Sequence, residues 1–223
     1  MHQRKSKKIL IYFFLLIIVS SIGNQSINNL KLNKIQNINI YGLEQINNRI
    51  ILNKIENLIL ENIFFIDKNE IEKIINSNSI IERYTVSKEY PSTININIVK
   101  TNFFAKINNN GKIYLIGSNG KLTLHESGYN ELPYIFGKPN IKEFLKFKTI
   151  IDKSKFSYYQ IKNIYFFPSK RWDLRLKNNI LLKLPNNLTQ ENLNNLYEFL
   201  EKYNGESFNI VDARLENKII LNE

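Results

Sequence analysis

The strongest hydrophobic signal in the chain is an uncharged apolar run near the N-terminus. It covers residues 9–22, ILIYFFLLIIVSSI. The cations that directly precede it are Arg4, Lys5, Lys7 and Lys8. An apolar run of this kind partitions out of water, and the cations that flank it resist crossing a membrane. We therefore expect residues 1–8 to stay in the cytoplasm and the chain after the run to be exported.

Two interpretations of this run stay open from its residues alone. A helix from Ile9 to Gly23 measures roughly 22 Å at about 1.5 Å per residue, which is short against a hydrocarbon core of roughly 30 Å. Flanking lysines that snorkel would close much of the gap. The rival interpretation is a cleavable signal peptide, for which Ser21, Ile22 and Gly23 would serve as the cleavage site.

The pattern downstream predicts a first domain of the order β-α-α-β-β. Residues 37–42 alternate polar and apolar positions and end in a glycine, which predicts a short strand. Helical spacing of apolar residues follows over 47–60, and again after Asp67, which begins a helix in the manner of a capping box. Residues 84–98 then alternate around a turn at 89–92, which is typical of a hairpin with one buried face.

The second half of the chain predicts a sheet with two flanking helices. One helix follows Pro139 and runs to about Ile151, and the other is capped by Thr189 and ends near Gly205. Between and around them lie the expected strands, at 103–105, 113–116, 132–137, 161–167, 172–176 and 180–184, with two β-like pieces in 208–221.

Composition narrows the chemistry of this protein. The sequence has no cysteine and two histidines, so disulfides, thiolate metal sites and a histidine-based triad are not expected. Net charge is +11, and without the four N-terminal cations the remaining 27 basic and 20 acidic residues are dispersed. We therefore expect no enzyme activity, no cofactor, no small-molecule substrate and no nucleic-acid partner, and we assign the excess positive charge to attraction by an anionic membrane surface.

Several motifs, in this order and at this spacing, resemble the FtsQ/DivIB family of bacterial cell-division proteins. They cover almost the whole chain after the apolar run. The motifs are INIYGLEQINN (38–48), FFIDKNEIEKII (64–75), IIERYTVSKEYPSTININIV (80–99), LPYIFGKP (132–139), RWDLRLKNNILLKLP (171–185) and IVDARLENKIIL (210–221).

The resemblance implies an α+β fold: an N-terminal transmembrane helix, a β-α-α-β-β POTRA-like domain, and a mixed, mainly antiparallel β domain with flanking helices. The implied limits are a cytoplasmic tail at 1–8, the transmembrane helix at 9–24, a spacer at 25–36, the POTRA-like domain at 37–101 and the β domain at 102–223. Members of this family keep the N-terminal helix uncleaved, which implies a single-pass type II protein of the inner membrane at the division septum, with its ectodomain in the periplasm.

The resemblance also implies a function without catalysis. The protein would be a scaffold of the division machinery that binds FtsB- and FtsL-like single-pass proteins by addition of a partner strand to its C-terminal edge strand. The residues implied for partner binding are Arg171, Arg214, Leu215, Asn217, Lys218, Ile219, Ile220 and Leu221.

Other interpretations of these residues stay open. An ion pair with Asp212 would give Arg214 a structural role, exposure decides whether Leu215 is an anchor or core, and Trp172 fits the core. At the level of function, the alternatives are a POTRA-type component that assembles outer-membrane or secreted proteins and a secreted adhesin.

Overall fold

The structure is a computed structural model, and it describes residues 4–22, 34–56, 62–64, 66–125, 128–203, 208–215 and 218–222. Contacts divide the chain into two compact units, one of Met1–Ile74 with Thr85–Asn97 and one of Ile75–Tyr84 with Ile98–Glu223.

The first helix, α1 (Arg4–Ile22), carries the apolar run, and its side chains from Ile9 to Val19 are exposed. No helix within the described ranges is long and apolar enough to cross a membrane. The predicted transmembrane helix over 9–24 is therefore not supported. The physical reason is length, because the fourteen apolar or small residues of the run give about 21 Å of helix against a hydrocarbon core of about 30 Å.

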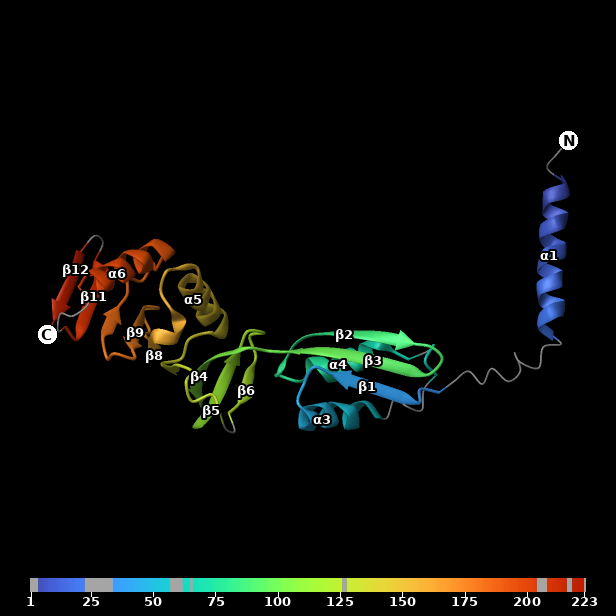
Figure 1. Cartoon of the computed structure of the whole chain (residues 1–223), viewed down its shortest axis with the longest axis horizontal. Coiled ribbons are helices and arrows are strands. Elements are labelled where there is room, and N and C mark those ends of the chain that lie inside the picture. The colour runs from blue at the N-terminus through green and yellow to red at the C-terminus, as the bar shows by residue number, and fades with distance from the viewer. Residues whose placement is uncertain are drawn as a thin grey trace. The chain divides into compact units, whose positions relative to one another are not determined.

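The N-terminal domain has the predicted order β-α-α-β-β (Figure 1). Its elements are β1 (Asn37–Tyr41), α3 (Gln45–Ile55), α4 (Lys68–Asn76), β2 (Ile81–Glu89) and β3 (Thr93–Lys100). The strand order is β1-β3-β2, and β1 runs parallel to β3.

The alternation in β3 buries one of its faces, as predicted from the sequence. Ile94 and Ile96 are fully buried, and Ile38 and Ile40 of β1 lie directly opposite them. The other face is polar, and there Asn39 donates a side-chain hydrogen bond of 2.9 Å to Asn95. Asp67 accepts a hydrogen bond from the backbone of Asn69 at the start of α4, which agrees with its expected role as a cap.

The C-terminal domain is built on a nine-stranded mixed sheet. The strand order is β12-β11-β10-β9-β8-β7-β4-β5-β6. The strands are β4 (Phe103–Asn109), β5 (Lys112–Gly117), β6 (Leu122–Leu124), β7 (Tyr134–Phe136), β8 (Ile161–Phe166), β9 (Trp172–Leu176), β10 (Leu181–Lys183), β11 (Ile210–Leu215) and β12 (Lys218–Asn222). The pairs β4–β7, β7–β8 and β10–β11 are parallel, and the others are antiparallel, which confirms the mixed, mainly antiparallel prediction.

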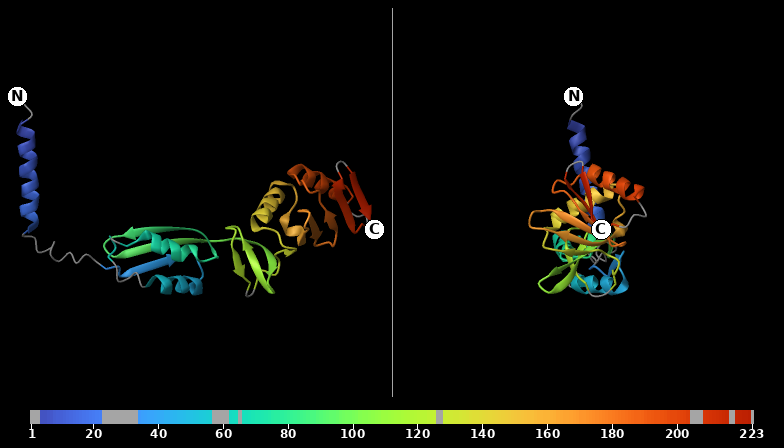
Figure 2. Two further views of the ribbon diagram at one scale, coloured as in Figure 1. Left: turned by 180° about the vertical axis from the view of Figure 1, so that it is seen from behind. Right: turned by 90° about the vertical axis from the view of Figure 1, so that its left-hand side faces the viewer.

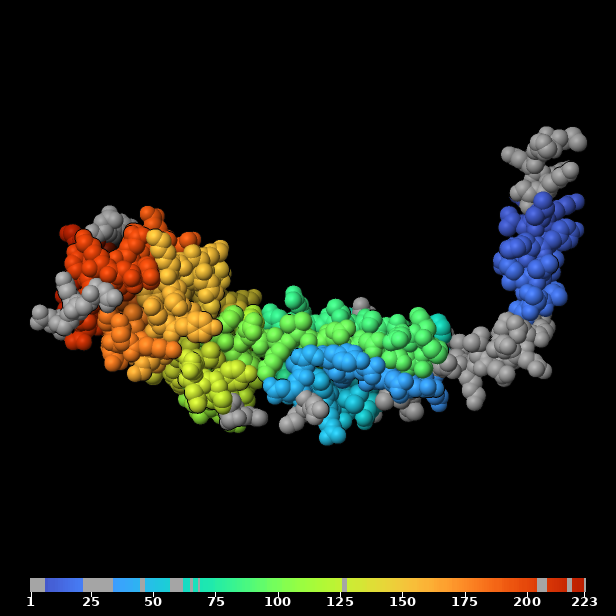
Figure 3. Space-filling view, viewed as in Figure 1, coloured from blue at the N-terminus to red at the C-terminus, as the bar shows by residue number. Residues whose placement is uncertain are grey.

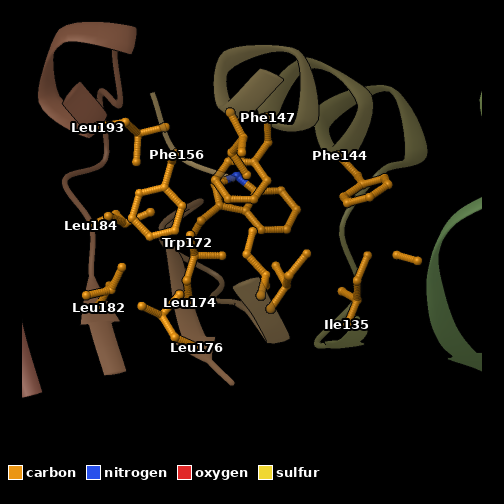
Figure 4. Packing of buried hydrophobic residues seen from close by; sticks show 14 of the residues in the cluster. Ile135, Phe144, Phe147, Phe156, Trp172, Leu174, Leu176, Leu182, Leu184 and Leu193 are labelled. Atoms are coloured by element: carbon orange, nitrogen blue, oxygen red, sulfur yellow. The ribbon is translucent and has the colours of Figure 1, made fainter. Parts of the chain in front are cut away.

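Helices α5 (Ile141–Lys153) and α6 (Gln190–Lys202) pack on one face of this sheet (Figure 2). Their apolar sides meet a row of directly opposite strand residues that are all buried, Ile135, Ile164, Leu174, Leu182 and Val211. Trp172 completes this core, because its indole stacks on Phe147 of α5 with ring centroids 4.5 Å apart (Figure 4). The prediction that Trp172 is a core residue is confirmed.

Candidate partner-binding edge of the C-terminal sheet

Strand β12 forms one edge of the nine-stranded sheet. It is last in the strand order, and β11 is its one neighbour among the strands that the structure describes (Figure 1). Two of its apolar side chains are partly in water, with Ile220 53% and Leu221 41% exposed, while Ile219 packs against the core. An edge strand presents backbone N–H and C=O groups that another strand can bind, so this edge is the candidate site.

The register between β11 and β12 decides where these side chains point. Leu221 lies opposite Val211 and thus on the same face of the sheet as the buried row, whereas Ile220 lies opposite Asp212 on the other face. The pairing is irregular between Asp212 and Leu215, a bulge-like shift that lies opposite the first residues of β12, Lys218 to Ile220. Strand β12 therefore shows apolar side chains on both faces of the sheet edge.

A charged row crosses the outer face of the sheet next to this edge. Lys183 of β10 lies directly between Asp173 of β9 and Asp212 of β11. Each of these aspartates also binds an arginine two residues away on its own strand, because residues i and i+2 of a strand share a face. The face of the sheet away from α5 and α6 thus carries a network of alternating charges on β9, β10 and β11. Ile220 of β12 lies next to Asp212 at the end of this row.

The ion pair of this network that lies further from the edge, Arg171 with Asp173 on β9, is largely buried. The Arg171 Nε donates to Asp173 Oδ1 over 3.1 Å, and its guanidinium lies 4.4 Å from the centre of the Phe167 ring. Asp173 is 3% exposed and also accepts from the backbone N–H of Leu184 over 3.4 Å. Because both charges are satisfied within the domain, Arg171 is held in a fixed position.

The outer ion pair, Arg214 with Asp212, is more open to water. The Arg214 Nε donates to Asp212 Oδ1 over 2.8 Å, and its Nη2 donates to Oδ2 over 2.5 Å. The Arg214 hydrogen bond, with a smaller contribution from the Lys183 charge, lowers the pKa of Asp212, and the same hydrogen bond raises the pKa of Arg214. The ion pair that stood as the alternative for Arg214 is thus present, and the Arg214 side chain is still 44% exposed.

A cavity of 380 Å³ brings three of the predicted site residues together. Arg171, Arg214 and Leu215 line it, as do Pro185 and Asn187 of the segment before α6 and Asn192 of its first turn. None of the described residues of β12 lines the cavity. Leu215 is 57% exposed, which meets the condition under which the sequence predicts an anchor for a partner.

The other predicted site residues fall on or beside the edge strand. Lys218, Ile219, Ile220 and Leu221 belong to β12, whereas Asn217 lies outside the described residues. Sequence reasoning considered Asp212 as an ion-pair partner of Arg214 and missed Asp173 and Lys183 as parts of the site. The signal was available in the spacing of two between opposite charges in RWD and DAR, which places each pair on one face of a strand.

The fold and this site define a two-domain α+β protein with a POTRA-like first domain and a second domain whose sheet has an open edge. A family model described as POTRA domain, FtsQ-type matches residues 33–100, and a second, described as Cell division protein FtsQ/DivIB, C-terminal, matches residues 103–214. The chain belongs to the FtsQ/DivIB family of cell-division proteins, as its motifs predict. The finer domain limits at 37–101 and 102–223 stay predictions.

Curated relatives carry the same description. The Cell division protein FtsQ of Blochmanniella floridana is 28% identical over 131 residues, which cover 53% of this chain and 46% of that protein. The FtsQ proteins of Rickettsia bellii and Rickettsia conorii are 26% and 24% identical over 200 and 196 residues, each covering 83% of this chain and 70% of the relative. The chain thus spans about half the length of the Blochmanniella protein.

Proposed function

We propose that this protein is a non-catalytic scaffold of the bacterial division machinery, and that it binds FtsB- and FtsL-like single-pass proteins by strand addition at β12. The observation that carries this proposal is the half-exposed apolar edge strand, with Ile220 and Leu221 in water on opposite faces. A lone apolar edge promotes aggregation unless a partner covers it. Membership of a cell-division family makes division proteins the expected partners.

Strand addition accounts for both affinity and register. A partner strand would bind the outward N–H and C=O groups of β12, and its side chains would alternate between the row of Leu221 and the row of Ile220. An apolar side chain beside Leu221 would extend the core under α6, and one beside Ile220 would meet the charged row. The register would therefore be set by which partner residue faces the core.

The cavity beside the edge would bind the partner segment that follows or precedes its strand. Leu215 would contact an apolar side chain, and the exposed part of Arg214 would bind an acidic one. Asp212 and Asp173 hold the two guanidinium groups in place before the partner arrives, which reduces the entropy lost on binding.

We propose also that α1 attaches the protein to the cytoplasmic membrane, with residues 1–8 on the cytoplasmic side and the two domains in the periplasm at the septum. The exposed apolar side chains from Ile9 to Val19 support attachment, and the preceding cations support this orientation. Because the helix is short, a single pass and a shallow insertion are both possible outcomes. A protease-accessibility assay on spheroplasts, whose outer membrane has been opened, separates them. A tag at residue 1 that stays protected from protease added outside is the expected result.

The edge model is tested by comparing the two edges of the same sheet. Leu221→Asp changes β12, and Leu124→Asp is the matched control, because Leu124 lies on the opposite edge strand β6 and is 46% exposed. The full-length protein, tagged at its N-terminus, is extracted from membranes after mild crosslinking, and bound proteins are identified by mass spectrometry. We expect Leu221→Asp to lose small single-pass division proteins and Leu124→Asp to retain them.

Two further variants test the cavity. Leu215→Asp and Arg214→Glu should leave the protein folded, since both side chains are exposed, and should abolish partner recovery. Unchanged recovery with normal folding would rule out the C-terminal edge as the binding site. Recovery of outer-membrane assembly factors in place of division proteins would contradict the scaffold function itself.

A further inference from the structure

Two exposed aromatic side chains stack on each other at one end of the N-terminal domain. Phe64 and Tyr90 have ring centroids 5.0 Å apart and an interplanar angle of 27°. Phe64 is 54% and Tyr90 is 58% exposed. A stacked pair that leaves more than half of each side chain in water is not part of the core, so its apolar surface needs another explanation.

This pair lies at the end of the domain where β1 begins. Lys34 forms a β-bridge with Asn62, and the Asn62 side chain accepts a hydrogen bond of 3.0 Å from the backbone of Phe64. The backbone of Gln36 donates a hydrogen bond of 2.9 Å to Ser92, two residues after Tyr90. The hairpin turn and the start of β1 therefore meet, as Figure 3 shows for the green hairpin and the blue strand.

Buried residues support this end of the domain. Ile35, Ile63 and Ser92 are only 1%, 0% and 7% exposed. Ile63 precedes Phe64 in the sequence, Ser92 follows Tyr90 by two residues, and Ile35 lies between Lys34 and Gln36. Two cations, Lys34 and Lys88, are exposed at the same end. We call this end, made of Lys34, Gln36, Phe64, Lys88 and Tyr90, the aromatic tip.

Covalent geometry keeps the aromatic tip near α1. Residues Ile22 and Lys34 are twelve positions apart in the sequence, and a chain spans at most about 3.6 Å per residue, so the tip lies within about 43 Å of the end of α1. If α1 attaches to a membrane, as proposed above, the tip is the part of the domain that the chain tethers to the bilayer.

We propose that the aromatic tip docks on the outer surface of the same membrane and binds its anionic headgroups, an inference that rests on the proposed attachment of α1. Tyrosine, an aromatic ring with a polar handle, concentrates at the headgroup level of bilayers, and phenylalanine inserts at the boundary between headgroups and acyl chains. Lysines beside them are attracted to anionic lipids. Phe64 and Tyr90 enter the headgroup layer, and Lys34 and Lys88 bind phosphates. Docking orients the POTRA-like domain on the membrane and limits its rotation about the tether.

The absence of cysteine from the sequence allows one labelled position at a time. The full-length protein is reconstituted into vesicles of neutral and anionic phospholipid with a fluorescent label at Gln36→Cys, which leaves both aromatic rings intact. The matched control is a label at Tyr41→Cys, an exposed position at the other end of β1. Quenching is measured with a nitroxide carried on the lipid headgroup, and vesicle flotation is measured in parallel.

Docking predicts that the headgroup nitroxide removes about half or more of the emission at position 36 and little at position 41. It also predicts that the double variant Phe64→Ser/Tyr90→Ser, or vesicles of neutral lipid alone, reduce the quenching at 36 to the level at 41. Equal quenching at both positions, or none at 36 in protein that floats with the vesicles, would overturn the docking and leave the attachment of α1 intact. Protein that fails to float would overturn both.

Discussion

Asp212 is the residue on which the charges of the candidate site converge. It pairs with Arg214 on its own strand and lies opposite Lys183 on the next. Its role is to fix the Arg214 side chain beside the cavity, so Asp212→Asn should weaken partner binding through Arg214 while β11 and β12 stay paired. Arg214 then keeps its charge and loses its orientation.

The lowered pKa of Asp212 makes a prediction about pH. A carboxylate whose pKa is lower in the folded than in the unfolded state contributes stability above the unfolded pKa of about 3.9, and this contribution is lost as pH falls through the lower, folded pKa. Asp212→Asn should therefore lower the urea midpoint at neutral pH and lose this effect in strong acid. A difference from wild type that is as large in acid as at neutral pH would contradict the ion pair as its cause.

Lys148 is a buried cation whose partners are of two kinds, one carboxylate and the aromatic rings of Phe104 and Tyr158. It is 8% exposed, its Nζ lies 4.2 Å from the centre of the Tyr158 ring, and Asp152 accepts two hydrogen bonds from it. Burial raises the pKa of Tyr158, whose neutral hydroxyl donates to the backbone oxygen of Phe104 over 2.9 Å. The cation is thus enclosed by aromatic faces and balanced by one carboxylate.

This arrangement predicts that removing the lysine charge and removing the aspartate charge lower the free energy of unfolding by different amounts. Lys148→Met keeps the packing and leaves Asp152 half in water, so the free energy of unfolding should change by less than about 1 kcal/mol. Asp152→Asn leaves a buried ammonium without its counter-ion and should cost about 1–3 kcal/mol. Denaturant unfolding of both variants measures which one loses more stability. A larger loss of unfolding free energy for Lys148→Met than for Asp152→Asn would refute the prediction.

At the scale of single elements, helix α6 links local sequence to the site. Thr189 accepts from the backbone of Asn192, and the Asn192 side chain accepts from the backbone of Thr189. This capping box begins α6, and Asn192 also lines the cavity beside Arg171 and Arg214. The cap therefore fixes one wall of the candidate site.

Thr189→Ala should lower the free energy of unfolding by about 1 kcal/mol, because a backbone N–H loses its acceptor. It should also weaken partner binding, since the cavity wall starts at the cap. Asn140→Ala is the matched control, because it removes the cap of α5 at a site that does not line the cavity. Equal loss of binding in the two variants would show that the cap acts through stability alone.

The elements were predictable from sequence because their signals are local. Alternation in Ile94 and Ile96, the cap at Thr189 and the turn at 89–92 each depend on a few neighbouring residues. The limits of the site were not predictable, because they depend on strand order. The parallel pairing of β10 with β11 places Lys183 between Asp173 and Asp212, and no local pattern specifies which distant strands become neighbours.

The burial of Asp173, on the face of the sheet away from the helices, was also not predictable from neighbouring residues. The alternation of Trp172, Leu174 and Leu176 with Asp173 and Arg175 suggests a polar, solvated second face. Asp173 is instead 3% exposed, because Arg171 and the backbone of Leu184 enclose it. The exposure of Leu215, which the sequence leaves open, needed the structure, since a leucine at the end of a strand fits either core or surface.

At the scale of the whole molecule, the proposed functions lie in separate parts of the chain. In these proposals helix α1 attaches to the membrane, the aromatic tip docks on it, and β12 binds the partner. Each is carried by apolar side chains left in water, at Ile9 to Val19, at Phe64 and Tyr90, and at Ile220 and Leu221. Apolar surface that stays exposed in an ordered element marks an interface.

The most direct test of the central claim is photo-crosslinking in dividing cells from single positions on the two edges of the C-terminal sheet. A photoreactive amino acid replaces Ile220 on β12 or Leu124 on β6, and the crosslinked proteins are identified by mass spectrometry. The account predicts that position 220 captures small single-pass division proteins and that position 124 does not. Capture of these proteins from position 124 alone, or equally from both, would contradict strand addition at β12.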